Sequence, residues 1–582
     1  MNVASSLRRL YSSPLGSFLP LPNPHGYLDA ANLADCDEGP PVSNLGAVTG
    51  CGWRLEGATG FGTVLFAVPT ALLPNLPPIQ IDVVIPDQTQ WSPELWGTLD
   101  ASRSSHMTDG RFNQLGITKH VLEVLGYWSS SLPDFERQYL ALPFSSSIVV
   151  EEIIVDVKKT RVKFVPETRQ HMHLMTSDEL RNLWKLPESE MPESIDIHQM
   201  RYFERKAPGI AVVQIIGAEL EGPAILKARG GDPDALYHEL KQLLRMPPHK
   251  NVVARPLFLV TVRSPGSGID KVCGFILKYY PGPNFEQGLK KKNRDGTLRL
   301  SDQLSWAKDV ARGLLHVQNS PVKFASDLKM DNIMMPMDDG QEIAVLIDFE
   351  QSRNVFAWAP REIYLIEWLA IVANSSRVAP SVRRKYTTLI QEYSKSRGVN
   401  FLTLGRSELY DNPDVGWYLP WVTSTASEQE AGNVCLLGKV IWCIFEGVGN
   451  INVGLRASKP DNESPEFPAF VRSPPVIQDL VKRCTEGSRE WLDGPLGLRR
   501  NGSKIYPRGK SGLDGEPRAN LDETRAAIQK VWAGELEKGE AIVGARMRHD
   551  KGIATADDME ELRYLKRPKL QEVLDELEKI SF

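Results

Sequence analysis

Residues 324–350 read FASDLKMDNIMMPMDDGQEIAVLIDFE, and two short patterns within them decide how the whole chain is interpreted. The first is D-L-K-x-x-N, which contains Asp327, Lys329 and Asn332. The second is a D-F-E turn that begins at Asp348, directly after a strand predicted over the apolar residues 343–347. Transfer of a γ-phosphate gives a protein little covalent chemistry to perform, so its task is to place charges. Together the two patterns supply the charges that transfer to a hydroxyl group requires.

Each of the four side chains fits one role in that chemistry. Asp327 can orient the attacking hydroxyl and accept its proton, and Lys329 can reach the transferred phosphate. Mg²⁺ prefers hard oxygen ligands that it shares with substrate phosphates, which suits Asn332 and Asp348. The expected cofactors are therefore ATP and Mg²⁺. A solvated turn between a helix and a hairpin could also produce D-L-K-x-x-N, so the pattern needs support from elsewhere in the chain.

That support lies upstream, in residues 223–244. Residues 223–227 predict a short strand ending at Lys227, and residues 232–244 predict a helix that carries Glu239. A strand lysine, a helix glutamate, a catalytic loop and a D-F-E turn in this order resemble the protein-kinase-like superfamily. In that superfamily the lysine holds the α- and β-phosphates and the glutamate orients it. The resemblance makes Lys227 and Glu239 nucleotide-binding residues, although either alone would be interpreted as a surface residue.

The resemblance extends to the segments around the catalytic loop. It places Leu277 and Tyr279 on the strip between two lobes, where adenine would bind through backbone contacts. Residues 301–319 have an apolar face and resemble the helix that leads into the catalytic loop. Residues 433–447 resemble the buried helix of the large lobe, whose first position is usually aspartate and is Asn433 here. The D-F-E-Q and W-C-I-F-E-G strings also resemble a divergent group of fungal kinase-like proteins.

The chain departs from the family pattern in its phosphate loop. The Gly-rich loop G-x-G-x-x-G should precede the Lys227 strand, but residues 207–222 offer only Gly209, Gly217 and Gly222. Gly209 falls near the last glycine of the pattern, so it is the residue expected to approach the phosphates.

Two further departures surround the catalytic groups. The family's His-Arg pair before the aspartate is Ala325-Ser326, so a phosphate on the activation segment has no arginine to bind. The glycine of the family's D-F-G turn is Glu350, which should restrict the backbone because glycine alone freely takes positive φ. A D-F-E turn is also found in choline-kinase-like and other small-molecule kinases of the superfamily.

We therefore predict an α+β class with a two-lobed protein-kinase-like fold, an extra N-terminal α+β domain and a helical C-terminal tail. The expected parts are a disordered tail (1–29), an unassigned α+β domain (30–174), the kinase-like domain (175–492) and a loose segment followed by C-terminal helices (493–582). The kinase-like domain is divided into a small lobe (175–280) and a large lobe (281–492). The large lobe contains a largely helical insert (352–416) that could be a lid, a substrate platform or an inhibitory plug.

The expected function is ATP- and Mg²⁺-dependent phosphotransfer to Ser or Thr hydroxyls, because the Asp-x-Lys pair matches that subgroup. One alternative is a pseudokinase scaffold, favoured by the incomplete Gly-rich loop, Glu350 and the large insert. A second alternative is a small-molecule kinase, for which the D-F-E turn is the positive sign. The partners are then ATP and a protein substrate or partner whose identity the sequence does not give.

Composition limits the other possibilities. The 582 residues carry a net charge of −5, which gives no electrostatic footprint for nucleic acid. No apolar run is long enough to span a bilayer. The six cysteines lack C-x-x-C spacing, so a reduced intracellular setting is expected, cytoplasmic or alternatively nuclear. Arg8 and Arg9 in an acid-free N-terminus give a faint resemblance to a mitochondrial presequence.

Overall fold

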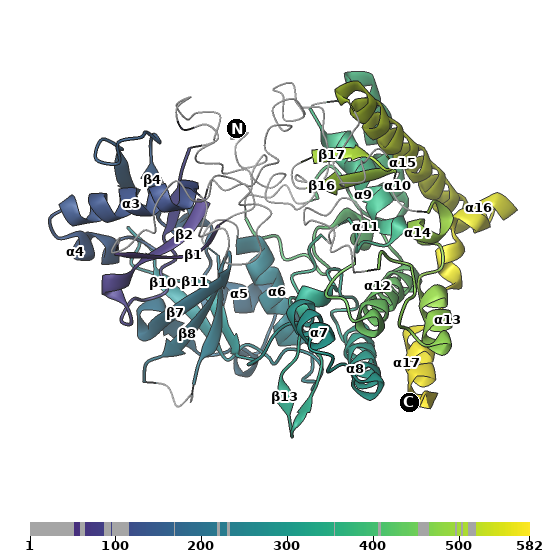
Figure 1. Cartoon of the computed structure of the whole chain (residues 1–582), viewed down its shortest axis with the longest axis horizontal. Coiled ribbons are helices and arrows are strands. Elements are labelled where there is room, and N and C mark those ends of the chain that lie inside the picture. The colour runs from purple at the N-terminus through teal and green to yellow at the C-terminus, as the bar shows by residue number, and fades with distance from the viewer. Residues whose placement is uncertain are drawn as a thin grey trace. The chain divides into compact units, whose positions relative to one another are not determined.

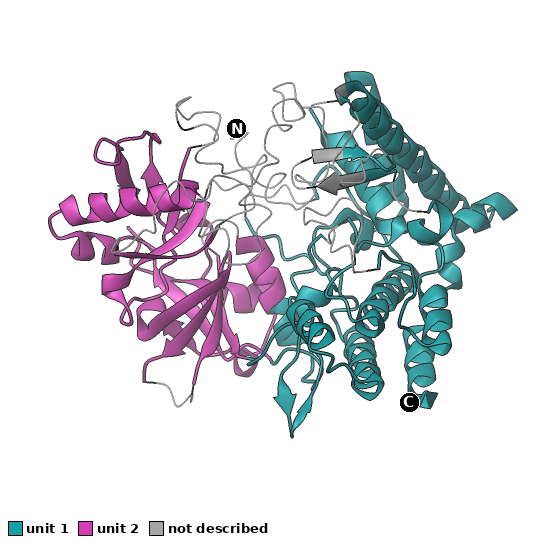
Figure 2. Cartoon of the chain, in the orientation of Figure 1, with its two compact units in different colours: residues 1–30, 241–254, 280–582 teal, residues 31–240, 255–279 magenta. Residues whose placement is uncertain are grey.

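The fold is taken from a computed structural model. It describes residues 52–58, 64–86, 95, 116–167, 169–217, 222–229, 233–353, 356–376, 378–404, 409–451, 465–494, 497–501, 504–509 and 520–582. The expected N-terminal tail lies outside these residues. Within them the chain mixes helices with several sheets, which agrees with the predicted α+β class (Figure 1). It divides into two compact units: residues 31–240 with 255–279 form unit 2, and the remainder forms unit 1 (Figure 2).

Unit 2 contains a five-stranded sheet in the region expected to be an unassigned α+β domain. Its strands run in chain order across the sheet, and only β3 and β4 are parallel. The elements are β1 (Trp53–Ala58), β2 (Val64–Pro69), β3 (Asp82–Val84), α3 (Gly116–Ser131), α4 (Phe135–Leu140), β4 (Ser147–Val150) and β5 (Val162–Val165). Edge-on ring contacts join Trp53 of β1 to Phe135, and Trp128 of α3 to Phe164 of β5. These aromatic contacts fix the helices on the sheet.

The second sheet of unit 2 has six strands in the order β6-β10-β11-β9-β8-β7. The elements are α5 (Ser177–Trp184), β6 (Ser194–Asp196), β7 (Met200–Ala207), β8 (Ile210–Ile215), β9 (Ala224–Ala228), α6 (Pro233–Arg245), β10 (Phe258–Arg263) and β11 (Asp270–Lys278). The division between the two units falls within α6, after Leu240. The strand predicted over residues 223–227 and the helix predicted over residues 232–244 are confirmed as β9 and α6.

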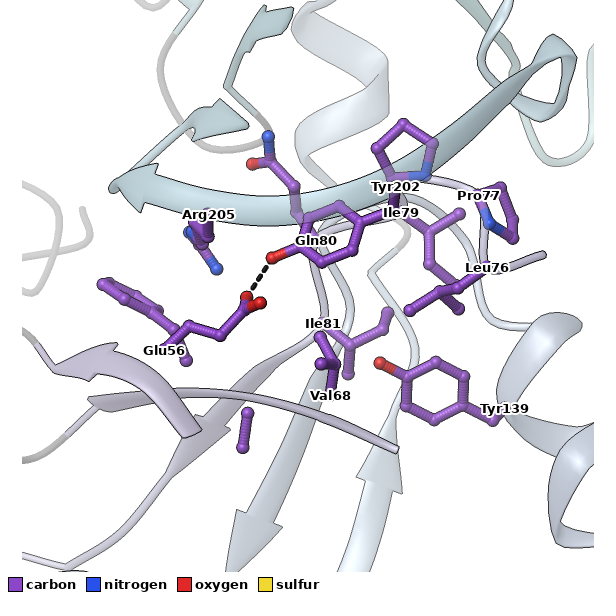
Figure 3. Close-up of a pocket in the computed structure, with 13 residues that line it drawn as sticks. Glu56, Val68, Leu76, Pro77, Ile79, Gln80, Ile81, Tyr139, Tyr202 and Arg205 are labelled. Atoms are coloured by element: carbon purple, nitrogen blue, oxygen red, sulfur yellow. Dashed lines mark hydrogen bonds between the residues drawn. The ribbon is translucent and has the colours of Figure 1, made fainter. Parts of the chain in front are cut away.

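A layer of polar contacts joins the two sheets of unit 2. Figure 3 shows the Tyr202 hydroxyl of β7 donating to the Glu56 carboxylate of β1, beside a cavity of about 20 Å³. Arg205 pairs with Asp82 at 2.7 Å and lies over the Phe66 ring. A cavity of that size has room for about one water molecule. The segment expected as a separate N-terminal domain therefore lies in one compact unit with the segment expected as the small lobe.

From residue 280 onward, unit 1 contains two helices followed by two pairs of short strands. These elements are α7 (Phe285–Arg294), α8 (Leu300–Asn319), β12 (Ile333–Met334), β13 (Met337–Asp338), β14 (Gln341–Glu342) and β15 (Val345–Leu346). The helix predicted over residues 301–319 is confirmed as α8, which buries Leu304, Ala307, Ala311 and Leu314. Antiparallel pairing of β12 with β15 brings the two halves of the 324–350 stretch together.

The remainder of unit 1 is mainly helical. Its elements are α9 (Arg361–Asn374), α10 (Pro380–Ser396), α11 (Leu419–Val422), α12 (Ala426–Glu446), α13 (Pro475–Cys484), α14 (Arg489–Leu492), β16 (Leu498–Asn501), β17 (Lys504–Pro507), α15 (Leu521–Asp550), α16 (Ala556–Glu561) and α17 (Leu570–Lys579). No helix in the described ranges is both long and apolar enough to cross a membrane.

The expected insert and the C-terminal helices share one core. Leu369 of α9, Ile390 of α10 and Ile542 of α15 are fully buried in the same apolar cluster. Polar contacts also join α9 and α10 to α15. The Tyr364 hydroxyl of α9 donates to Glu535 at 2.8 Å, and the Tyr386 hydroxyl of α10 donates to Glu540 at 2.7 Å. The insert and the C-terminal helices therefore form one helical layer.

Candidate functional site

Unit 2 brings together the predicted lysine and glutamate. Strand β9 lies between β8 and β11, where Lys227 is paired in register with Ile210 and Phe275. The Lys227 ammonium forms an ion pair with the Glu239 carboxylate of α6, and both side chains are buried. Two charges in a low-dielectric interior are stable only when each has a partner, so this pairing fixes both side chains.

Gly209 occupies the turn between β7 and β8, next to the end of β9. Its carbonyl accepts a hydrogen bond from the Ala228 backbone amide at 2.8 Å, and its φ is +77°. A Cβ on Gly209 would lie 2.6 Å from the Ala228 carbonyl oxygen, so glycine is required here. Gly217 and Gly222 follow β8 instead and have open space around them. The three glycines therefore do not gather in one loop.

The predicted adenine strip belongs to the same sheet. Leu277 is a largely buried residue of β11 and is paired with Ile225 of β9. Tyr279 follows the end of β11 and is half-buried. Unit 2 thus holds all five residues that the sequence assigned to the nucleotide.

Unit 1 brings together the residues of the D-L-K-x-x-N loop. The Lys329 ammonium donates to the Asp327 carboxylate at 2.8 Å. The Asn332 amide nitrogen donates to the Asp327 backbone carbonyl at 2.9 Å and to the Asp327 carboxylate at 3.1 Å. Oδ1 of Asp327 is buried and makes no hydrogen bond within the described part of the chain. The loop therefore presents one carboxylate oxygen that neither Lys329 nor Asn332 occupies.

The acidic residues around this loop shift the pKa values of Asp327 and Lys329. The pKa of Asp327 is raised to about 7, because burial and the nearby carboxylates Asp348 and Asp331 together outweigh the opposing effect of Lys329. The pKa of Lys329 is also raised, because the attraction of Asp327, Asp331 and Asp348 outweighs the effect of burial. Lys329 therefore stays charged, while Asp327 has a pKa suited to exchanging a proton near neutral pH.

The D-F-E turn is attached directly to this loop. The Ile347 amide donates to the Asn332 backbone carbonyl at 3.1 Å, which places Asp348 beside the loop. Asp348 and Gln351 have positive φ values of 69° and 49°. Glu350 is not among the positive-φ residues, which agrees with the expected restriction of its backbone. The left-handed positions lie on either side of Glu350, and no glycine is needed at that residue.

The segment after the turn is held on the catalytic loop by neutral hydrogen bonds. The Gln351 amide donates to the carbonyls of Val322 at 2.9 Å and Phe324 at 3.3 Å. The Ser326 hydroxyl donates to the Ser352 carbonyl at 2.8 Å. The sequence predicted no role for Gln351, and Ser326 stood out only as the replacement for the family's arginine. The D-F-E-Q string was the one signal that pointed to Gln351.

Helix α12 contacts the catalytic loop through the Asn433 side chain. The Asn433 side chain accepts from the Ala325 amide at 3.1 Å and donates to the Ala325 carbonyl at 2.9 Å. The Phe324 ring stacks on Trp421 with a centroid distance of 4.8 Å. Because the Asn433 side chain carries both a donor and an acceptor, it satisfies both the amide and the carbonyl of Ala325, two residues before Asp327.

Two side chains of unit 1 carry oxygen atoms of the kind that bind a magnesium ion. The Asn332 amide nitrogen is directed at Asp327, so its carbonyl oxygen faces away and can act as a ligand. Asp348 directly follows Ile347, whose amide donates to the Asn332 backbone carbonyl, and its carboxylate can supply a further oxygen ligand. Carboxylate and amide oxygens are the ligands that Mg²⁺ takes when it is bound with phosphates.

No protein-family model matches this chain, and no curated protein matches it either. Its function has to be inferred from the two groups of side chains themselves.

Proposed function

We propose that this chain is an ATP- and Mg²⁺-dependent phosphotransferase of the protein-kinase type that acts on Ser or Thr hydroxyls. The observation that carries the proposal is the contact set of Asp327, Lys329 and Asn332, with Asp348 attached to it. The buried ion pair of Lys227 with Glu239 supports it independently. In kinases the strand lysine, the helix glutamate and the metal-binding aspartate must all be in place for transfer.

In this proposal each side chain has one task. Lys227, oriented by Glu239, binds the α- and β-phosphates, and Asn332 and Asp348 hold Mg²⁺, which neutralises the phosphate charge. The free oxygen of Asp327 accepts a hydrogen bond from the substrate hydroxyl and orients it for in-line attack. Lys329 keeps Asp327 in place and stabilises negative charge on the phosphoryl group as it moves.

A pseudokinase scaffold is the second candidate. The specific observation in its favour is that only Gly209 of the three glycines lies in the turn between β7 and β8, so fewer backbone amides can approach the phosphates. A small-molecule kinase has the D-F-E turn in its favour. The cytoplasmic location and the protein substrate stay predictions.

Magnesium-dependent stabilisation by ATP tests the nucleotide site. A ligand that binds only the folded state at about 100 times its Kd stabilises it by about 2.7 kcal/mol, so we expect Tm to rise when ATP and Mg²⁺ are added together. Lys227→Ala and Asp348→Ala should lose this rise, each compared with the same variant without ATP. The controls are Lys159→Ala and Asp575→Ala, which replace exposed side chains and should keep it. A wild type that shows no rise at millimolar ATP would contradict the proposal.

A further inference from the structure

The last two turns of α6 are held by a loop of the expected insert, residues 410–414. The Lys241 ammonium donates to Oδ1 of Asn412 at 3.0 Å and to the Pro413 carbonyl. The Gln242 amide donates to the Asp414 carbonyl at 2.9 Å. All of these residues belong to unit 1. Two adjacent side chains of α6 therefore have partners on a segment about 170 positions later in the sequence.

The Lys241 and Gln242 side chains need these hydrogen-bond acceptors because both side chains are buried. Lys241 is 2 % exposed and Gln242 is 0 % exposed. The pKa of Lys241 is lowered to about 8, because burial and the nearby Arg245 outweigh the opposing effect of Asp414 and Asp411. A buried ammonium without acceptors is strongly disfavoured. The position of α6 in this structure thus depends on the acceptors of the loop.

The loop is itself held in shape from its other side. The Trp417 indole donates to the Asp411 carboxylate at 2.7 Å, and the Tyr410 ring packs edge-on against Trp417. Asn412 has a φ of +54°, a conformation that asparagine, aspartate and glycine tolerate better than other residues. The loop therefore offers its acceptors in a fixed arrangement.

From these contacts we infer that residues 410–414 are a positioning element that holds α6 where Glu239 pairs with Lys227. The inference rests on the proposed function and gives one part of the insert a role in nucleotide binding. Gln242 lies one turn after Glu239, so the loop contact and the ion pair are on adjoining turns of one helix. Lys241, Gln242 and Asn412 are positioning residues, because they act through Glu239.

The test compares a replacement at position 412 that removes the acceptor with one that keeps it. Asn412→Gly tolerates positive φ but removes Oδ1, whereas Asn412→Asp keeps an acceptor at the same place. Lys241→Met removes the donor from the other side. The rate of amide hydrogen exchange in residues 233–245 reports how firmly the loop holds α6. The Kd for MgATP reports the effect of the loop on nucleotide binding. Exchange of α12 serves as the control for folding.

We expect faster exchange of α6 in Asn412→Gly and Lys241→Met, with α12 unchanged, and wild-type exchange in Asn412→Asp. The loss of a hydrogen bond from a charged donor should raise the Kd for MgATP by about tenfold in the first two variants. Exchange of α6 that stays at the wild-type rate in both would overturn the inference, whether or not ATP binds. A wild type that binds no ATP would instead overturn the proposed function, and the exchange rates would still decide whether the loop holds α6.

Discussion

Asp327→Asn is expected to lower the rate of ADP formation from MgATP by about 10²–10⁴-fold, the usual contribution of a general base. Asparagine keeps the shape and one oxygen that can accept from Lys329, but it cannot take up a proton from the substrate hydroxyl. The binding of MgATP should be kept, because Asn332 and Asp348 are unchanged. Steady-state ADP formation and the Kd for MgATP, measured on the same preparation, separate the two effects.

The matched control for this variant is Asp338→Asn, because Asp338 lies on the exposed hairpin strand β13. It should leave both the rate and the Kd at their wild-type values. An Asp327→Asn variant that forms ADP as fast as the wild type would show that Asp327 is not the base. The choice of Asp327 would then have to be abandoned.

Arg567→Met is expected to destabilise unit 1 by about 3–5 kcal/mol, the cost of breaking a buried ion pair from one side. Arg567 and Glu362 form an ion pair in which neither side chain is exposed to solvent. The guanidinium also donates to the carbonyls of Glu486 at 2.8 Å and Ala431 at 2.9 Å. Methionine would leave the Glu362 carboxylate buried without its cation. The midpoint of urea unfolding, followed by tryptophan fluorescence, measures the effect.

Two further variants control for this result. The double replacement of Arg567 by Met and Glu362 by Leu removes both charges and should recover much of the lost stability. Arg483→Met breaks the half-exposed pair with Glu576, and pairs of that kind contribute about 0–1 kcal/mol. Equal effects of Arg567→Met and Arg483→Met would contradict the assignment of Arg567 as a buried structural residue.

The two residues of this pair lie far apart in the sequence. Glu362 contacts an arginine that lies 205 positions later, on the segment before α17. Arg489, by contrast, pairs with its neighbour Glu490. No local pattern could have revealed the first pair, because both partners sit in unrelated parts of the sequence.

The elements with a strong periodic pattern were predictable from the sequence. Strand β9 and helices α6 and α8 lie within a residue or two of the predicted segments, because their apolar spacing and their Pro or polar caps are local signals. Helix α12 begins at Ala426, before the predicted residues 433–447, because Thr425 and Glu428 form a capping box. The expected C-terminal helices are interrupted, because α16 ends at Glu561 and α17 begins only at Leu570. Pro568 lies in this interval and cannot continue a helix.

Within the candidate site, the local groups were predictable and the distant supports were not. Asp327, Lys329 and Asn332 are close in sequence, so their contact follows from one turn of the chain. The pairing of Lys227 with Glu239 was expected from the resemblance to the protein-kinase-like superfamily, in which a strand lysine is oriented by a glutamate of the next helix. The hold of Asn412 on Lys241 depends on a contact across 171 positions, and only the folded chain reveals it.

The most direct test of the central claim is transfer of the γ-phosphate from labelled MgATP to a library of Ser- and Thr-containing peptides. The proposed function predicts that the wild type labels Ser or Thr side chains, that labelling requires Mg²⁺, and that Asp327→Asn abolishes it. Binding of MgATP without labelled peptide and without ADP formation would contradict a phosphotransferase and favour the scaffold. ADP formation that increases only with small hydroxyl compounds would contradict the protein-substrate class and favour a small-molecule kinase.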